Sequence, residues 1–522
     1  MAQVNIRNNI KNNILGAAGL CWLTGFLFSS GISAQTKDKN TKSKNQIEIV
    51  WCDSLGQEGK TKGDFKRLLG NVRLKHEDAL MFCDSAHYYA SIRRVLAFSK
   101  VHIKQADTLD LFGNYLEYDG IERKALVKGN VKLIDKKTHL FAKAIVYDVS
   151  NRVASYTDSG KIINENNTLT SITGTYNAKK KLFHFKDSVR IVNPEYVMTG
   201  DTMDYNTETG TAFFYGPSRV RGDSIYMYCE RGWYNTKKDE MQIWKRSYID
   251  NKKQIVRGDS LYFNNKNGHG KAYRNITITD TANSVMVQGN YAWYYKNPEK
   301  FMVTDRAVFI QFSKADSLYL HADSINSVTL QTKTGIPYRL MRAYHKCKIF
   351  SRGLQAKCDS LSYSFQDSVI RLYRKPVLWS DVNQLTSDSI AIFTKNRQAE
   401  KMELYNSAFI VALVDSIRFN QIKGRNMTAY FRDNKMFKIS IDGNGETIYF
   451  LVDKLGQIGW NKAKCSKIDI LVDNGKIKQI IEYTNPEGTL NPPLKDIDKQ
   501  QLPGFVWLDK MRPKDKSDIF RK

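Results

Sequence analysis

Acidic residues recur at one position of a repeated pattern, and such carboxylates could support acid–base catalysis or calcium binding. The pattern is an Asp-Ser or Gly-Asp step, in most copies followed by an aromatic residue. The calcium-binding β-roll period and the EF-hand spacing are both missing from the sequence. We therefore interpret the repeated Asp as a ladder residue beside a turn, although a catalytic carboxylate pair stays open. The copies contain Asp84, Asp201, Asp223, Asp259, Asp323, Asp359 and Asp388.

Other common catalytic and metal-binding patterns do not occur. The 8 histidines are scattered, and none pairs with a Glu as in a metallopeptidase motif. The sequence has neither a G-x-S-x-G step nor a P-loop, and no paired C-x-x-C for zinc. We predict that the protein is not an enzyme and that it uses no cofactor and no metal.

The elements that carry these residues are strands, in a two-strand unit that recurs about every 30 residues from near residue 48 to near residue 470. The second half of each unit is a short turn followed by an alternating strand. Gly-Asn or Asp-Ser is expected to permit that turn. A fixed period of this length indicates a stacked array, in which each unit buries its apolar face against its neighbours. We predict an elongated all-β fold.

The alternating strands have one apolar face and one basic face. Val131 and Leu133 point to one side and Lys132 to the other, because successive side chains of a strand alternate. The same holds for Arg190 between two apolar neighbours. Alternation alone does not say which face binds a ligand. The apolar positions are Val72, Leu74, Val101, Ile103, Val131, Leu133, Val189 and Ile191.

The net charge and the N-terminal segment limit the compartments and partners that the sequence allows. Lys and Arg exceed Asp and Glu by 80 − 53 = 27, which favours attraction to a polyanion. Arg7 and Lys11 precede a short apolar stretch over residues 14–28, and small residues follow up to Ala34. This is typical of a signal peptide cleaved after Ala34, and an uncleaved anchor is the alternative. Export makes nucleic acid an unlikely partner.

The chain divides into five predicted segments. Residues 1–34 are the signal peptide, 35–46 a basic flexible leader, 47–200 the regular repeat core and 201–475 its continuation. Residues 476–522 form a basic tail with half of the prolines, and this tail is either mostly disordered or has a docking or capping role. Cys347 and Cys358 could face each other across two strands, but we favour free, buried thiols over disulfides.

Three units resemble a known family. Residues 68–74 (LLGNVRL), 79–89 (ALMFCDSAHYY) and 126–133 (LVKGNVKL) are similar to the OstA-like family, which is related to the periplasmic lipopolysaccharide-transport protein LptA and to the N-terminal domain of LptD. The match is best from about residue 48 to 200. The resemblance implies an open, V-shaped β-jellyroll whose two sheets enclose an apolar groove for acyl chains. The eight apolar positions named above are then candidates for that groove.

The resemblance also implies a function and partners. We expect a non-enzymatic conduit for lipopolysaccharide that is peripheral to the membranes and joins other transport proteins through added edge strands. On that view the first regular unit, around Val72, is an assembly edge. The alternatives are an exported β-solenoid that acts on or binds an anionic polysaccharide, and a structural envelope scaffold. This chain is much longer than the single-domain bridge protein, so whether it spans the periplasm alone is open.

Overall fold

The computed structural model describes residues 46–521 except for short internal gaps at 59–64, 107, 224, 314–315, 396–397, 433–434, 454–455, 474–475 and 492–499. The predicted signal peptide and nearly all of the predicted leader lie outside the described residues. The described chain from residue 46 onward forms one compact unit. No helix within it is long and apolar enough to cross a membrane.

The regular structure is almost entirely β, and all the strands belong to one hydrogen-bonded sheet. The first strands are β1 (Glu48–Trp51), β2 (Ser54–Glu58), β3 (Phe65–His76), β4 (Ala79–Tyr89), β5 (Arg94–Gln105), β6 (Leu109–Asp119), β7 (Lys124–Asp135), β8 (Thr138–Asp148), β9 (Val153–Tyr156), β10 (Gly160–Asn164), β11 (Asn167–Ser171), β12 (Thr173–Asn177), β13 (Leu182–Asn193) and β14 (Tyr196–Asn206).

The middle of the chain continues with strands of similar length. These are β15 (Thr211–Gly222), β16 (Tyr226–Asn235), β17 (Glu240–Asp250), β18 (Gln254–Asn264), β19 (His269–Asp280), β20 (Val285–Tyr295), β21 (Lys300–Gln311), β22 (Leu318–Gln331), β23 (Pro337–Phe350) and β24 (Gln355–Ser364).

The last part has shorter strands and then two short 3-10 helices. It comprises β25 (Val369–Tyr373), β26 (Val377–Ser380), β27 (Asn383–Thr386), β28 (Ser389–Lys395), β29 (Gln398–Tyr405), β30 (Ala408–Leu413), β31 (Phe419–Gly424), β32 (Asn426–Arg432), β33 (Lys435–Asp453), β34 (Gly456–Asp473), β35 (Lys476–Tyr483), β36 (Glu487–Asn491), η2 (Asp509–Met511) and η3 (Asp518–Phe520).

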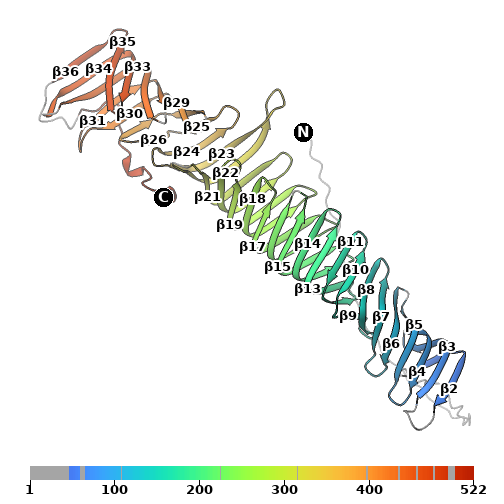
Figure 1. Ribbon diagram of the computed structural model, residues 1–522. Helices are drawn as coiled ribbons and strands as arrows, with labels where there is room; N and C mark the ends of the chain where they lie inside the picture. Colours follow the sequence, from blue (N-terminus) through green and yellow to red (C-terminus); the bar gives the residue numbers. More distant parts are fainter. Residues whose placement is uncertain are drawn as a thin grey trace, which may run out of the picture. The chain divides into compact units, whose positions relative to one another are not determined.

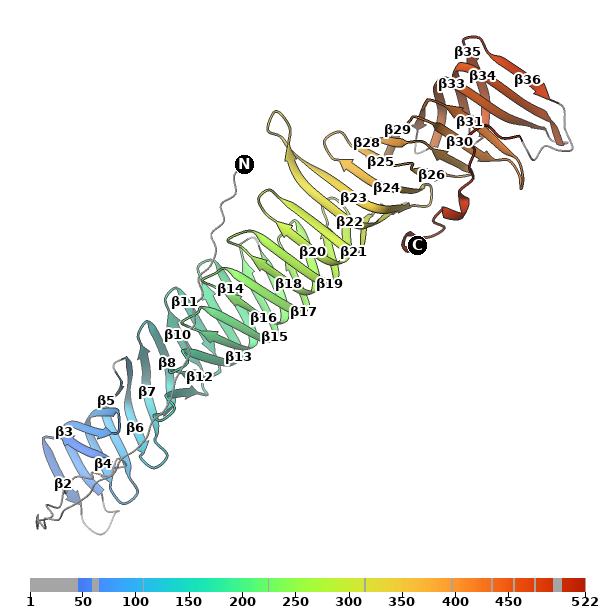
Figure 2. The same cartoon turned by 180° about the vertical axis from the view of Figure 1, so that it is seen from behind.

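The strands follow one another as an antiparallel meander, in the order of the chain (Figures 1 and 2). Between β8 and β13, the strands are each split into two pieces, so that β8 pairs with both β9 and β10. The same splitting recurs from β25 to β32. Pairing continues to β36, beyond the boundary expected near residue 475.

Most of the long odd-numbered strands carry, at their middle, two residues in left-handed conformation that interrupt the pairing. In β3 these are Gly70 and Asn71, with φ of 73° and 48°, and the register shifts between Leu69 and Val72. Gly and Asn tolerate this conformation best, which explains the Gly-Asn step. The expectation that this step is a turn between strands was wrong. It is a β-bulge inside a strand, and both a turn and a bulge favour the same residues.

The bends divide the array into two half-sheets that share one interior. Leu68 lies before the bend of β3, and Val72 and Leu74 lie after it, yet all three belong to the same buried cluster. That cluster extends from Ile47 to Val472. The fold is thus the β-jellyroll that was predicted, with inward apolar side chains on both half-sheets.

The repeated Asp of the sequence pattern stands at the bend, beside the bulge of the neighbouring strand. The hydroxyl of Ser99 donates a 2.7 Å hydrogen bond to Asp84, and Lys100 lies 3.5 Å from the same carboxylate. Both contacts lower the pKa of Asp84. Asp259 likewise accepts from Asn275 at 3.0 Å. These carboxylates hold the bulges in place, in line with the ladder interpretation.

The first regular unit is not an edge. β1 and β2 both pair with β3, so Val72, which is 1% exposed, lies inside the sheet. The expected assembly edge at this unit is therefore wrong, because residues 48–58 cover it. The outermost strands of the described chain are β1 and β2 at one end and β35 and β36 at the other.

Candidate functional site

The eight apolar candidates all point into the interior between the two half-sheets. None of them is more than 2% exposed. Val72 and Leu74 lie on β3, Val101 and Ile103 on β5, and the other four on β7 and β13. Lys132 and Arg190, which alternate with them, point outward. The predicted separation of an apolar face from a basic face is confirmed as a geometry, whereas lipid contact by these residues stays a prediction.

Four of these candidates belong to a row of apolar side chains that passes from strand to strand along the array. In this row each residue stands directly opposite the next one on the adjoining strand. It spans β3 to β31. It ends where Ile422 of β31 faces the polar side chain of Thr447 on β33. We call it the inner row. It runs Leu74, Met81, Ile103, Leu111, Leu133, Leu140, Ile162, Leu169, Ile191, Met198, Val220, Met227, Ile249, Val256, Ile278, Val287, Phe309, Leu320, Ile349, Ala356, Leu378, Leu385, Ile410 and Ile422.

The inner row is continuous although the strands change length and split. Met198, Ile191 and Leu169 meet across β14, β13 and β11, where one strand is broken in two. Each side chain therefore has apolar neighbours on both adjoining strands, which is the unit of sheet stabilisation. The interior consequently presents an uninterrupted apolar path along the array.

A second column of residues closes the interior on the side away from the bends. It consists of buried tyrosines near one end of the even strands, spaced 30, 29, 29 and 29 residues apart. Each hydroxyl contacts a residue 38 to 42 positions earlier, which lies at or directly beside the end of another strand. We call these contacts the seam. Its tyrosines are Tyr88, Tyr118, Tyr147, Tyr176 and Tyr205, and their partners are Ile47, His76, Gln105, Asp135 and Asn167.

The seam is held by specific polar contacts. The hydroxyl of Tyr118 lies 2.5 Å from Nδ1 of His76. The hydroxyl of Tyr147 donates to Gln105, whose amide donates in turn to Asp78 at 2.9 Å. Burial raises the pKa of both tyrosines. They therefore remain protonated donors at any physiological pH.

The strongest seam contact is a three-residue cluster. The hydroxyl of Tyr176 donates to Asp135 at 2.7 Å, and Nζ of Lys181 lies 2.6 Å from the same oxygen. The Asp135 side chain is only 1% exposed, so its charge needs these partners. Beyond Tyr205 the column continues with Tyr234, which turns to Asp239, and then with Phe263, which has no hydroxyl. The seam thus belongs to the first part of the array.

Sequence reasoning missed the seam and part of its signal was available. Tyr88 and Tyr205 are the aromatic residues that follow two of the repeated Asp steps, whereas Tyr118 and Tyr147 follow no such step. A search for Tyr at a strict 29-residue spacing would have found them. The partners could not be found in this way, because they vary from His to Gln, Asp and Asn.

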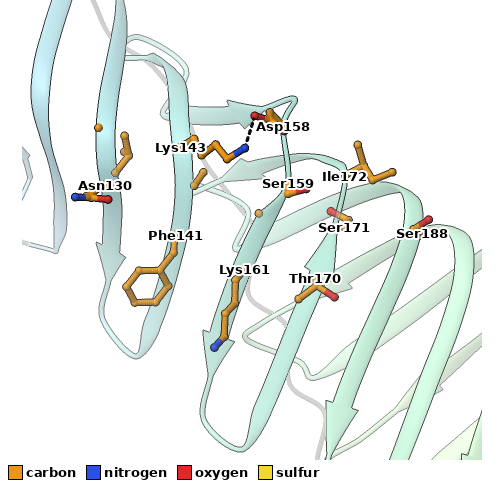
Figure 3. A pocket seen from close by; sticks show the side chains of 14 residues that line it. Asn130, Phe141, Lys143, Asp158, Ser159, Lys161, Thr170, Ser171, Ile172 and Ser188 are labelled. Carbon is orange, nitrogen blue, oxygen red and sulfur yellow. Dashed lines mark hydrogen bonds and ion pairs between the residues drawn. The ribbon is translucent and has the colours of Figure 1, made fainter.

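A depression on the outer surface lies near the bends of β7 to β13 (Figure 3). Its volume is about 840 Å³, and Phe141, Lys161, Thr170 and Ile172 are among its lining residues. Nζ of Lys143 lies 3.0 Å from the carboxylate of Asp158 at one side of it. Within the described ranges no three His, Cys, Asp or Glu side chains are grouped to hold a metal ion.

Fold and site together define a class: a bent antiparallel jellyroll with a continuous apolar interior. The family described as OstA-like protein matches residues 44–201, so this part of the chain is similar to that family. Among solved structures, the crystal structure of LptH, the LptA homologous periplasmic component of the conserved lipopolysaccharide transport device from Pseudomonas aeruginosa, aligns at 14% identity with a TM-score of 0.18, covering 19% of this chain and 76% of LptH. No curated protein matches the chain.

Proposed function

We propose that the protein carries lipopolysaccharide toward the outer membrane, with acyl chains along the inner row. The observation that carries the proposal is the unbroken apolar register from Leu74 to Ile422. A path for sliding acyl chains needs such continuity, since a polar interruption would have to be desolvated at each step. The likeness of residues 44–201 to OstA-like proteins favours the same class of ligand.

Lipid entry requires the half-sheets to part, and the seam is where they can part most easily. An acyl chain gains about 0.8 kcal/mol per buried CH₂, or roughly 10 kcal/mol for a chain of about a dozen. A single seam hydrogen bond contributes only about 1 kcal/mol net. A few seam contacts can therefore open for one lipid while the bends on the opposite side keep the half-sheets joined. The phosphorylated head would remain outside the opened seam.

The proposal includes a periplasmic location and partners at the terminal strands. The location depends on export and on cleavage after Ala34. Trp51 of β1 is 56% exposed and Leu490 of β36 is 71% exposed, on the outermost described strands at each end. Exposed apolar side chains on a terminal strand suit pairing with a partner sheet. We propose that other lipopolysaccharide-transport proteins add strands there, and that the protein carries out no catalysis.

Site-specific photocrosslinking in cells tests the conduit. A photoreactive residue is placed at Leu133 or Ile191 of the inner row, or at Val131 or Val189 beside it, with the exposed Lys128 of β7 as the matched control. Only variants whose thermal melting matches that of the parent protein are scored. We expect lipopolysaccharide adducts at the inward positions and none at Lys128. Adducts at Lys128 alone would show that the interior is not the path.

A further inference from the structure

The outer face of one half-sheet carries a second continuous row, which alternates cations with aromatic or hydroxyl side chains. Its members are also directly opposite one another on adjoining strands, and each lies one residue nearer the bend than the inner-row residue of the same strand. From β3 to β15 the odd long strands and β10 supply the cations. We call it the outer row. It runs Arg73, Phe82, His102, Phe112, Lys132, Phe141, Lys161, Thr170, Arg190, Thr199, Arg219, Tyr228, Tyr248 and Arg257.

Neighbouring members of the outer row stack on one another. The rings of His102 and Phe112 are 4.3 Å apart and nearly parallel. The guanidinium of Arg219 lies 5.7 Å from the ring of Tyr228, and that ring lies 5.7 Å from Tyr248. Arg257 covers the other side of this pair, 5.5 Å from Tyr248. Stacking fixes each guanidinium plane but leaves its N–H groups free to bind an anion.

Most cations of the outer row are not neutralised. Lys161, Arg190, Arg219 and Arg257 are exposed, and none of them has a carboxylate within ion-pair distance in the described part of the chain. His102 differs, because it lies 2.7 Å from Asp110. Unpaired cations in a regular line produce a positive stripe that attracts an extended anion rather than a point charge.

The depression of Figure 3 lies on this row. Phe141, Lys161 and Thr170 are consecutive members of the outer row and all three line it. Ser188, at the bulge of β13, adds a hydroxyl on the same side. An apolar ring, an ammonium group and hydroxyls around one hollow form a site suited to a sugar ring that bears an acidic group.

The chain itself occupies the continuation of the row. Beyond β20 the same register passes through Val308, His321 and Lys348. The ring of Phe520 in the C-terminal segment lies 4.7 Å from the ring of His321, and Lys348 donates to the carbonyl of Arg521. In this region the face is therefore covered by the short helix η3 at the end of the chain. From β3 to β18 no described segment lies across it.

We propose that the outer row binds an extended acidic polysaccharide along β3–β18. Cations on alternate strands recur about every 10 Å, twice the spacing of adjacent strands, which is comparable with the length of a disaccharide unit. Sugar C–H faces would pack on the aromatic members, and the carboxylate or phosphate groups would reach Lys161, Arg190 and Arg219. This role is separate from the interior path and does not depend on it.

Binding of oligogalacturonate to the exported chain, measured by calorimetry, tests the proposal. We expect the variant K161Q/R190Q/R219Q to bind about tenfold more weakly than the parent, since each exposed ion pair is weak on its own. The control K128Q/K186Q/K271Q removes the same charge from exposed positions that are not members of the outer row. It should lose no more than about twofold by the same reasoning. Equal losses in both variants would overturn the proposal.

A second arm separates a polysaccharide site from general attraction to polyanions. Y228T/Y248T keeps every cation and good strand-forming residues but removes two stacking rings. It should weaken oligogalacturonate binding about threefold and leave binding of polyglutamate unchanged. If polyglutamate of equal charge binds the parent as tightly as oligogalacturonate, the surface is only an electrostatic one and the proposal fails. Thermal melts confirm that each variant is folded.

Discussion

The hydroxyl of Tyr176 donates a 2.7 Å hydrogen bond to Asp135, a buried carboxylate 41 residues earlier in the chain. The two residues belong to opposite ends of strands on the two half-sheets, so this bond ties one half-sheet to the other. Lys181 supplies the compensating charge. The interior is therefore closed on this side by local hydrogen bonds that are individually weak. On the other side the two half-sheets are joined by the continuous backbone of each bent strand.

Removing the hydroxyl of a seam tyrosine should lower the free energy of unfolding more than removing the hydroxyl of an exposed tyrosine. Tyr176→Phe leaves Asp135 with one fewer donor in a buried position, and we expect the free energy of unfolding to fall by about 1.5–3 kcal/mol. Tyr273→Phe is the control, because Tyr273 is 39% exposed and its hydroxyl has no hydrogen-bond partner among the described residues. Denaturant unfolding measures both. A cost below that of the control would mean that the seam adds no stability.

The Asp78 contacts predict a pH dependence with a definite sign. Burial raises the pKa of Asp78, but hydrogen bonds from Gln105 and Arg152 outweigh it and lower the pKa below its usual 3.8. A lowered pKa gives stability that is present above 3.8 and is lost as the pH falls through the folded-state pKa. Since the Asp78 side chain is 49% exposed, we expect only about 0.5 kcal/mol.

Asp78→Asn and Arg152→Gln test this dependence together. Each should lower the free energy of unfolding at pH 7, and the double variant should lose no more than about 0.5 kcal/mol beyond either single one. The difference between Asp78→Asn and the parent protein should fade in acid. A difference that stays constant down to the lowest pH at which the protein folds would rule out the charge of Asp78 as its origin.

Local patterns in the sequence predicted the half-buried strands but not the contacts between half-sheets. Alternation placed Leu133 and Ile191 inside correctly, because strand period and burial are local properties. The Gly70-Asn71 step was misread, since turns and bulges require the same left-handed residues. His76 and Tyr118 are 42 residues apart, and no local rule relates them. The outer row could not be predicted from the sequence, because only the strand register shows that residues such as Arg219 and Tyr228 lie opposite each other.

The C-terminal segment shows a different limit of sequence reasoning. Its prolines and basic residues are as typical of a disordered end as of a docked one. In the structure Leu502, Phe505 and Trp507 pack on an apolar cluster of the outer face. Gln384 and Gln421, each 1% exposed, bond to the backbone of this segment. Buried amides in the middle of strands were the available indication, because such groups need partners.

Loosening this segment should be possible without disturbing the array. Gln421 donates to the carbonyl of Gln500 at 2.9 Å and accepts from the N–H of Leu502 at 2.8 Å. Gln421→Leu removes both bonds, worth about 2 kcal/mol, so amide exchange over residues 500–508 should accelerate about 30-fold. Mass spectrometry measures this rate of amide exchange. Gln242→Leu, on β17 away from the segment, should leave that exchange unchanged, and identical exchange in both variants would refute the anchoring role.

The thiols provide a prediction about redox state. Cys347 and Cys358 stand directly opposite each other on β23 and β24, and both are free and buried. The hydrogen bond between them and their burial raise the pKa of Cys347. Burial also raises the pKa of Cys83 and of Cys229 to about 12. Because the thiolate is the reactive form, these groups should resist alkylation in the folded protein.

Cys52 is the exception, because it is only half-buried. At pH 8 we expect iodoacetamide to modify Cys52 in the folded protein and to modify the remaining thiols only after denaturation. Cys52→Ser should abolish the native-state labelling and leave the count in denaturant lower by one. The most stringent test of the free-thiol prediction uses protein isolated from an oxidising compartment without reductant. If two thiols are then missing in denaturant and return with reductant, a disulfide has formed and the free-thiol prediction is wrong.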